Sequence, residues 1–171
     1  YTQVFVKGMP TWVQQGSKLT GGGETGSGVF GVSVALSSDG NTALIGGAED
    51  SSRTGAAWVF TRTEGTWTQQ GSKLTGGGEA GEAKFGFTVA LSANGNTALV
   101  SGPFDHADVG AAWAFTRTEG TWTQQGSKLT PRETFTNPLL FGTGVALSGE
   151  GNTALIGGSA LGLGWLFTRS G

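Results

Sequence analysis

Apolar residues alternate with small or polar ones along several short runs of the chain, which is the pattern of β-strands. Residues 30–37, FGVSVALS, carry an apolar side chain at every second position from Phe30 to Leu36. The turn sequence SDGN follows, and an Asp-Gly or Asn-Gly pair is a strong hairpin signal. We predict that residues 30–37 and the apolar run TALIGGA, residues 42–48, form an antiparallel hairpin.

A second hairpin is predicted immediately afterwards. Residues 55–62, GAAWVFTR, and residues 67–75, WTQQGSKLT, flank the turn sequence TEGT. Trp67 and Leu74 are an odd number of residues apart, so a bulge at Gly71 is expected to place them on one face. No apolar 3.6-residue period runs longer than one turn, so we expect an all-β chain without helices.

The four runs recur every 55 residues. Trp12, Trp67 and Trp122 each begin a W-[VT]-Q-Q-G-S-K-L-T segment, and the 21 residues from Gly55 differ from those from Gly110 only at one position. The whole chain, residues 1–171, is therefore one repeat array. Its parts are the last two strands of a unit (1–20), two full units (30–75 and 85–130) and a third unit without its outer strand (141–171).

Four antiparallel strands that repeat at this period predict the blade of a β-propeller. Each such sheet has two apolar faces, which stacking around an axis would bury. Three blades are fewer than the four to eight of known propellers, so we expect an incomplete ring or a ring completed by another chain. Two copies would supply six blades, and further repeats of a longer chain are the alternative.

The composition excludes several function classes. Gly contributes 33 residues, which suits a β-protein with tight turns. The net charge is −2 without a cluster of Lys or Arg, so nucleic-acid binding is not expected. No apolar run is long enough for a membrane span. The chain has no Cys, which excludes disulfides and thiolate metal sites.

The pattern FG-x-S-V-A-L-S, G-N-T-A-L and G-A-A-W-V-F resembles the FG-GAP repeat, the blade unit of integrin α-subunit propellers and of bacterial surface and secreted proteins. The FG pairs begin at Phe30, Phe85 and Phe141. The resemblance implies a propeller with this run as the innermost strand, and an extracellular or cell-surface location. Many members of the family bind calcium between the first two strands, but the turns here offer one carboxylate, none and one, at Asp39 and Glu150. We therefore predict no metal site.

No pattern of catalytic residues appears. His106 is the only His, so a catalytic triad would have to use it, and no nucleophile motif accompanies it. The Gly-rich segments around residues 20–25 and 75–80 lack the Lys-Ser/Thr of a phosphate-binding loop. We predict a protein that is not an enzyme, without a catalytic residue or a cofactor.

The segments that vary between units are the best candidates for ligand contacts. These are the loops between the second and third strands, residues 49–54, 104–109 and 159–162. The candidate ligand residues in them are Asp50, Arg53, Asp105, His106 and Asp108. The connector 130–142 is longer and more apolar than its equivalents. It either forms a contact surface or packs on its own blade.

The expected function is a non-enzymatic scaffold or protein-interaction module that binds a protein or glycan ligand through these loops. One alternative is a structural protein that joins its copies, with a dimer preferred, by strand exchange at open edges. Another is a glycan-binding propeller with exposed Trp side chains. The residues expected at the assembly edges are Val4, Phe5, Trp12, Trp165 and Phe167.

Overall fold

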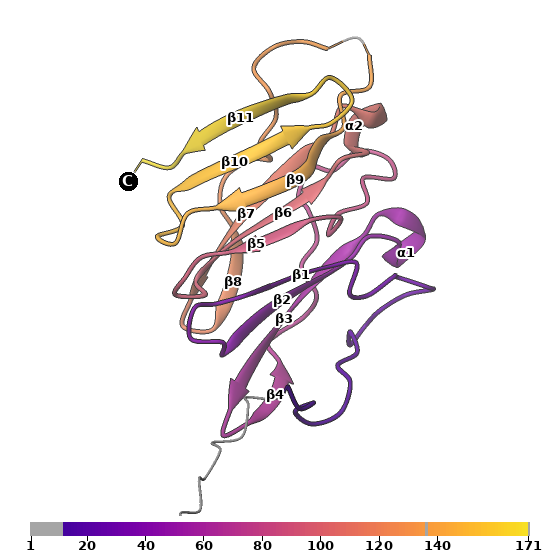
Figure 1. Cartoon of the computed structure of the whole chain (residues 1–171). Coiled ribbons are helices and arrows are strands. Elements are labelled where there is room, and N and C mark those ends of the chain that lie inside the picture. The colour runs from indigo at the N-terminus through magenta and orange to yellow at the C-terminus, as the bar shows by residue number, and fades with distance from the viewer. Residues whose placement is uncertain (1–11, 136, 171) are drawn as a thin grey trace, which may run out of the picture.

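The computed structural model describes residues 12–135 and 137–170, so the expected edge residues Val4 and Phe5 lie outside the described residues. The described part contains three antiparallel sheets that follow one another through the molecule (Figure 1). The first sheet has the order β1-β2-β3-β4 and the second β5-β6-β7-β8, and the third contains β9, β10 and β11 with β10 in the centre. The predicted all-β class is confirmed.

The strands lie close to the predicted runs. In the first sheet they are β1 (Ser33–Leu36), β2 (Thr42–Gly47), β3 (Ala56–Thr63) and β4 (Thr66–Gln69). In the second they are β5 (Val89–Leu91), β6 (Thr97–Gly102), β7 (Ala111–Thr118) and β8 (Thr121–Gln124). The third comprises β9 (Phe141–Leu147), β10 (Thr153–Gly158) and β11 (Leu163–Thr168).

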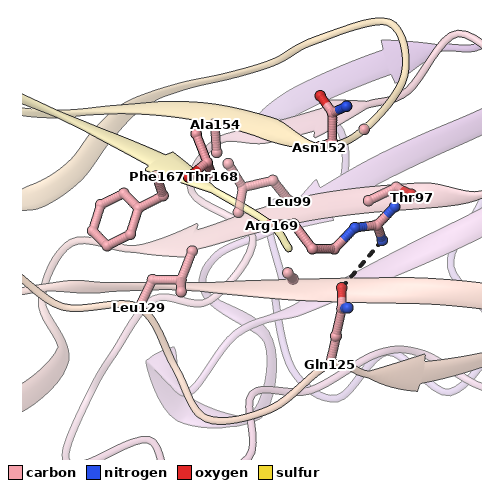
Figure 2. A pocket seen from close by; sticks show the side chains of 11 residues that line it. Thr97, Leu99, Gln125, Leu129, Asn152, Ala154, Phe167, Thr168 and Arg169 are labelled. Carbon is pink, nitrogen blue, oxygen red and sulfur yellow. Dashed lines mark hydrogen bonds between the residues drawn. The ribbon is translucent and has the colours of Figure 1, made fainter. Parts of the chain in front are cut away.

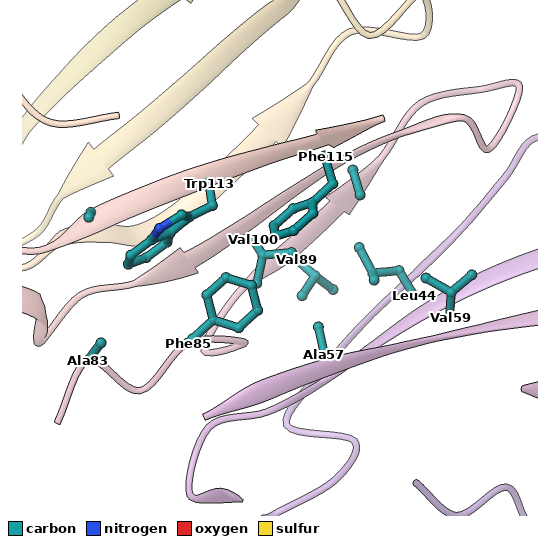
Figure 3. Packing of buried hydrophobic residues seen from close by; sticks show 11 residues of the cluster. Leu44, Ala57, Val59, Ala83, Phe85, Val89, Val100, Trp113 and Phe115 are labelled. Carbon is teal, nitrogen blue, oxygen red and sulfur yellow. The ribbon is translucent and has the colours of Figure 1, made fainter. Parts of the chain in front are cut away.

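Neighbouring sheets pack face to face. Leu44, Ala57 and Val59 of the first sheet meet Phe85 and Trp113 of the second in one buried cluster (Figure 3). A second cluster joins the second and third sheets in the same way. Both faces of the second sheet are therefore covered, and every residue of its central strand β6 is buried.

Each unit has the same aromatic group in its core. The Phe of the FG pair meets the edge of a Trp and a Phe from the third strand, as Phe85 does with Trp113 at 5.3 Å and Phe115 at 6.0 Å between ring centroids. The indole N–H of Trp113 donates to the carbonyl of Gly77 at 2.9 Å. Burying a Trp therefore leaves no unpaired donor here.

Glycine permits the close approach of the first two sheets. A Cβ on Gly46 of β2 would lie 2.0 Å from the backbone carbonyl oxygen of Gly86. Gly86 itself has a φ of +91°, a conformation that favours glycine. The backbones are thus too close for any side chain at position 46.

Three expectations about local structure need correction. The first strands of the first two units, β1 and β5, begin after Phe30 and Phe85, and Gly31 and Gly86 there adopt positive φ. Two four-residue helical turns, α1 (Asp50–Arg53) and α2 (Asp105–Asp108), were not expected. They lie in the loops between the second and third strands.

The third correction concerns the outer strand. Trp67 packs on the side of the first sheet that faces away from the second, whereas Leu74 packs in the cluster between the two sheets. The prediction that a bulge at Gly71 puts both on one face is wrong. The regular strand β4 ends at Gln69, and Gln70 still donates its N–H to the carbonyl of Val59 at 2.8 Å. The chain then leaves the sheet and returns at the bridge between Leu74 and Ala57.

We expect Gly46→Ala to lower the free energy of unfolding by about 1–3 kcal/mol, because the new methyl group overpacks a backbone contact. This corresponds to a fall in Tm of about 2–4 °C per kcal/mol for a domain of this size, measurable by circular dichroism. Gly144→Ala is the matched control, since no atom lies within 4 Å of its added Cβ. An equal effect of both variants would contradict the close-approach argument.

Candidate functional site

The loops between the second and third strands are held by a buried ion pair in each of the first two sheets. Asp50 is fully buried, and its Oδ2 accepts a hydrogen bond from the Lys73 ammonium at 2.5 Å. Its Oδ1 accepts the backbone N–H of Thr25 at 2.6 Å. One carboxylate thereby ties together the loop, the segment after β4 that carries Lys73, and the Gly-rich connector.

The second unit repeats this arrangement. Asp105 is fully buried, pairs with Lys128 at 2.5 Å and accepts the N–H of Ala80 at 2.7 Å. In the third unit the equivalent position is Leu161, which is exposed. The ion pair is thus a feature of the first two units.

The charge state of the first pair follows from its contacts. Burial alone would raise the pKa of Asp50, but the hydrogen bonds from Lys73 and Thr25 outweigh it and hold this pKa below its ordinary value. Asp50 is therefore ionised when the protein is folded. Asp50 and Asp105 hold the loops in shape, with their oxygen atoms already engaged inside the protein.

The ends of these loops have an unusual backbone. Ser51, Ser52 and Arg53 all have positive φ, and so do His106, Ala107 and Asp108 at the same place in the second unit. Each left-handed residue other than glycine costs roughly 1–2 kcal/mol. Such conformations persist only where the surroundings enforce them.

Hydrogen bonds from the next unit enforce this shape. The Arg53 carbonyl accepts the N–H of Lys84 at 2.9 Å. In the second loop the Asp108 carbonyl accepts the N–H groups of Leu139 and Leu140 at 3.0 and 2.9 Å. Each loop is therefore clamped between its own unit and the following one, and both lie at the same end of the sheets (Figure 1).

Three candidate ligand residues remain at the surface of these loops. Arg53 is exposed and bridges Glu49 and Glu82, with both distances 3.0 Å. His106 is exposed and Asp108 is half-buried. The structure thus separates the predicted set into two buried carboxylates and three residues within reach of solvent. Sequence reasoning missed the partners Lys73 and Lys128, although the spacing of 23 residues from Asp to Lys is the same in both units.

Glu79 is a further functional candidate that the sequence did not single out. Its Oε2 is buried without a hydrogen-bond partner in the described part of the chain. Burial, reinforced by the negative charge of Asp105 and partly opposed by Lys128, raises the pKa of Glu79 to about 7. This carboxyl group takes up and releases a proton near neutral pH.

The connector 130–142 packs on its own unit. Phe135 meets the edge of Trp165 at 6.0 Å, and Glu133 accepts the indole N–H of Trp165 at 3.3 Å. Leu139 is fully buried in the cluster between the second and third sheets. Between this connector and the α2 loop lies a groove of about 340 Å³, lined in part by His106 and Lys128.

The expected edge residues have different surroundings. Trp12 is fully exposed. Trp165 and Phe167 are half-buried against Phe141, at 5.4 and 5.9 Å between ring centroids. Phe167 also lines a cavity of about 180 Å³ between the second and third sheets.

Within residues 12–135 and 137–170, no group of three or more His, Asp or Glu side chains is arranged to hold a metal ion. None of the described helices has the length and apolar character needed to cross a membrane.

No protein-family model matches the chain, and no curated protein matches it.

Removal of Lys73 should leave Asp50 buried without its cation. We expect Lys73→Met to cost about 3–5 kcal/mol at pH 7. The folded-state pKa of Asp50 is lowered, so its stabilising contribution exists above the unfolded value near 3.8 and is lost as the pH falls. In Lys73→Met, the free energy of unfolding should therefore lack the fall at acid pH that comes from protonation of Asp50. The control is Lys18→Met, because Lys18 occupies the position equivalent to Lys73 but is exposed. The measurement is urea unfolding at several pH values.

Glu79→Gln should stabilise the protein at alkaline pH. Because the pKa is raised, the contribution of Glu79 is fully present below about 4.5 and is lost as the pH rises through about 7. After allowance for solvent screening of this partly exposed group, we expect a gain on the order of 1 kcal/mol, or about 2–4 °C in Tm, at pH 8.

The same variant should show little gain at pH 5, where Glu79 is already protonated. Glu24→Gln is the matched control, since the Glu24 carboxylate accepts the N–H of Gly28 at 2.8 Å. A gain for Glu79→Gln that does not change between pH 5 and pH 8 would refute the assignment.

Proposed function

We propose that this chain is a non-enzymatic β-propeller scaffold that binds protein ligands through the loops between the second and third strands. The observation that carries the proposal is a repeated contact between neighbouring sheets, which we call a joint. The same sheet-to-sheet packing and the same clamped loop occur twice, while the exposed residues change from Ser52 and Arg53 in the first loop to His106 and Ala107 in the second.

The propeller arrangement is supported by the direction of the stack. The FG segment of each following unit bridges the loop of the preceding one, through the pairs Gly55–Phe85 and Gly110–Phe141. A constant step between identical units generates a ring or an open superhelix. The resemblance to FG-GAP repeats favours the ring, and with it an extracellular or cell-surface location.

The role in binding is supported by how the loops are built. Left-handed residues other than glycine are costly and are concentrated at functional sites in proteins. Here the strained segments point to solvent at one end of the stack, and rigid support comes from the ion pairs beneath them. A rigid loop loses little entropy on binding, which favours affinity.

The chemistry of the site favours binding over catalysis. Asp50 and Asp105 are already paired with lysines, and His106 is exposed. The indole N–H groups of Trp58 and Trp113 donate to backbone carbonyls inside the protein, so these rings are core residues. Trp58 and Trp113 are therefore not available to stack on a sugar.

The proposal can be tested with peptides selected from a random displayed library on the immobilised chain. We expect Arg53→Ala or His106→Ala to weaken the selected peptides at least tenfold, equal to about 1.4 kcal/mol. The matched control is Asn94→Ala in the hairpin turn at the opposite end of the second sheet. Peptides that depend on Asn94 and not on Arg53 or His106 would place binding on the other end.

A sugar panel read by Trp fluorescence separates the glycan-binding alternative. We expect no sugar-dependent change from the buried Trp58 and Trp113. A saturable change that Trp67→Phe or Trp122→Phe abolishes would contradict the proposal and favour a glycan-binding protein.

A further inference from the structure

The third sheet has an apolar face that is covered in the other two sheets. Leu155 of β10 and Leu166 of β11 are 53% and 68% exposed. Their equivalents in the first sheet, Leu44 and Val59, are 0% and 1% exposed because the second sheet lies on them. We call Leu155 and Leu166 the open face of the third sheet.

The first sheet has the complementary open face. Val34 and Leu36 of β1 are 66% and 61% exposed. The equivalent of Val34 in the second sheet, Val89, is only 7% exposed because it packs on the first sheet. The two open faces thus correspond to the two sides of a joint that the chain already forms twice.

A cavity beside the third sheet marks where an aromatic side chain is missing. It is lined by Leu99, Ala114, Gln125 and Leu129 of the second unit and by Ala154 and Phe167 to Arg169 of the third (Figure 2). The equivalent residues of the first and second units surround Trp122, the first aromatic residue of the outer strand. The Trp122 N–H donates to Gln70 at 3.0 Å, and the Arg117 guanidinium lies 5.4 Å from its ring centroid.

The partners of such a Trp are already in place at the cavity. Arg169 donates to Gln125 at 3.2 Å, just as Arg117 donates to Gln70 at 3.1 Å (Figure 2). Gln125 and Arg169 would therefore receive an indole in the same geometry. The described residues of this chain place no Trp there.

Residues 12–20 are the segment that carries the missing Trp. Arg62 donates to Gln15 at 3.1 Å, which repeats the contact of Arg117 with Gln70. Leu19 packs on the first sheet as Leu74 packs on the second. Residues 12–20 thus lie against the first sheet in the position of a preceding unit's outer strand, with Trp12 fully exposed.

The third sheet offers the matching edge. Among residues 12–135 and 137–170, no strand pairs with β11 on the side away from β10. Its free N–H and C=O groups are therefore available for a further strand. In the first sheet the outer strand pairs with its neighbour through Arg62–Trp67, Thr61–Thr68 and Phe60–Gln69.

We propose that a second copy of this chain joins the first head to tail, with its Trp12 in the cavity below Arg169. Residues 12–20 of that copy pair with β11 in the register Arg169–Trp12, Thr168–Val13 and Phe167–Gln14. The open face of the third sheet then packs on the open face of the first sheet of the second copy. Two such joints close a ring of six blades, within the range of known propellers.

This joint lacks one feature that both internal joints have. Lys18 of the second copy takes the position of Lys73 and Lys128, which pair with Asp50 and Asp105. At the position of these two carboxylates the third unit has Leu161. No buried ion pair forms at this joint, so the loop of the third unit is not fixed by a carboxylate as the first two loops are. The inference rests on the proposed blade array, and not on what the loops bind.

Light scattering after size exclusion tests the joint. The 171-residue chain should have twice its monomer mass of 17.3 kDa at high concentration. Trp12→Ala and Leu166→Glu should each give monomers that keep the native circular dichroism, because both side chains are exposed in the free chain. Val13→Thr is the matched control and should keep the dimer, since Thr occupies this position and is exposed in the other two outer strands.

A mixture of the two monomeric variants distinguishes head-to-tail from symmetric pairing. Each variant retains the side of the joint that the other has lost, so the mixture should form a dimer through one intact joint. Larger multiples that Trp12→Ala abolishes would also support the joint, with a rotation that does not close at two copies. A wild-type monomer at all concentrations, a mass unaffected by either variant, or a mixture that stays monomeric would overturn the proposal.

Peptide binding to the loops is measured separately on the monomeric variants. If the joint fails but loop binding is found, only the head-to-tail inference is lost. If the loops bind nothing while Trp12→Ala still abolishes the dimer, the joint stands without the proposed ligand function.

Discussion

The close contact between the backbones of neighbouring sheets determines most of what surrounds it. Gly46 and Gly86 meet with no room for a Cβ, so the distance between the first two sheets is set by main-chain atoms. At that distance only small residues fit at the contact, while the large side chains of Phe85 and Trp113 pack edge to face, with 5.3 Å between their ring centroids. The Gly and Ala content of the strands follows from this constraint, as does the alternation of large and very small residues along them.

The buried ion pairs depend on this packing and in turn determine the loops. A buried pair of charges contributes little net stability, because desolvation offsets the Coulombic attraction. Its effect here is on conformation. The Asp50 carboxylate receives Lys73 and the Thr25 amide, so any other loop conformation would leave a charge buried without partners. That cost, about 3–5 kcal/mol, is comparable to the strain of the left-handed residues Ser51, Ser52 and Arg53, at about 1–2 kcal/mol each.

The sequence predicted the elements well because their signals are local. Alternation and the Asn-Gly and Asp-Gly turns placed β1 to β4 within a few residues, and the repeat carried the result to the other units. The left-handed turns could not be read from Ser51, Ser52 or His106, since those residue types do not demand positive φ. Hydrogen bonds from the next unit impose it. The ion pairs left a signal that only comparison of the units reveals, namely Asp and Lys 23 residues apart in the two units that have both.

Burial in this chain is a property of neighbours and not of local sequence. The central strand reads TALIGG in the first and third units, yet its Leu is 0% exposed as Leu44 and 53% exposed as Leu155. Full burial of such a side chain stabilises a protein by about 1.5–3 kcal/mol. Association that covers the exposed apolar side chains would therefore add stability that the free chain lacks. These side chains are Val34, Leu36, Leu155, Leu166 and Trp12. A single joint must first offset an association cost of at least about 4 kcal/mol. The second joint of a closed ring forms within one assembly and largely avoids that cost, which favours a closed ring over an open pair.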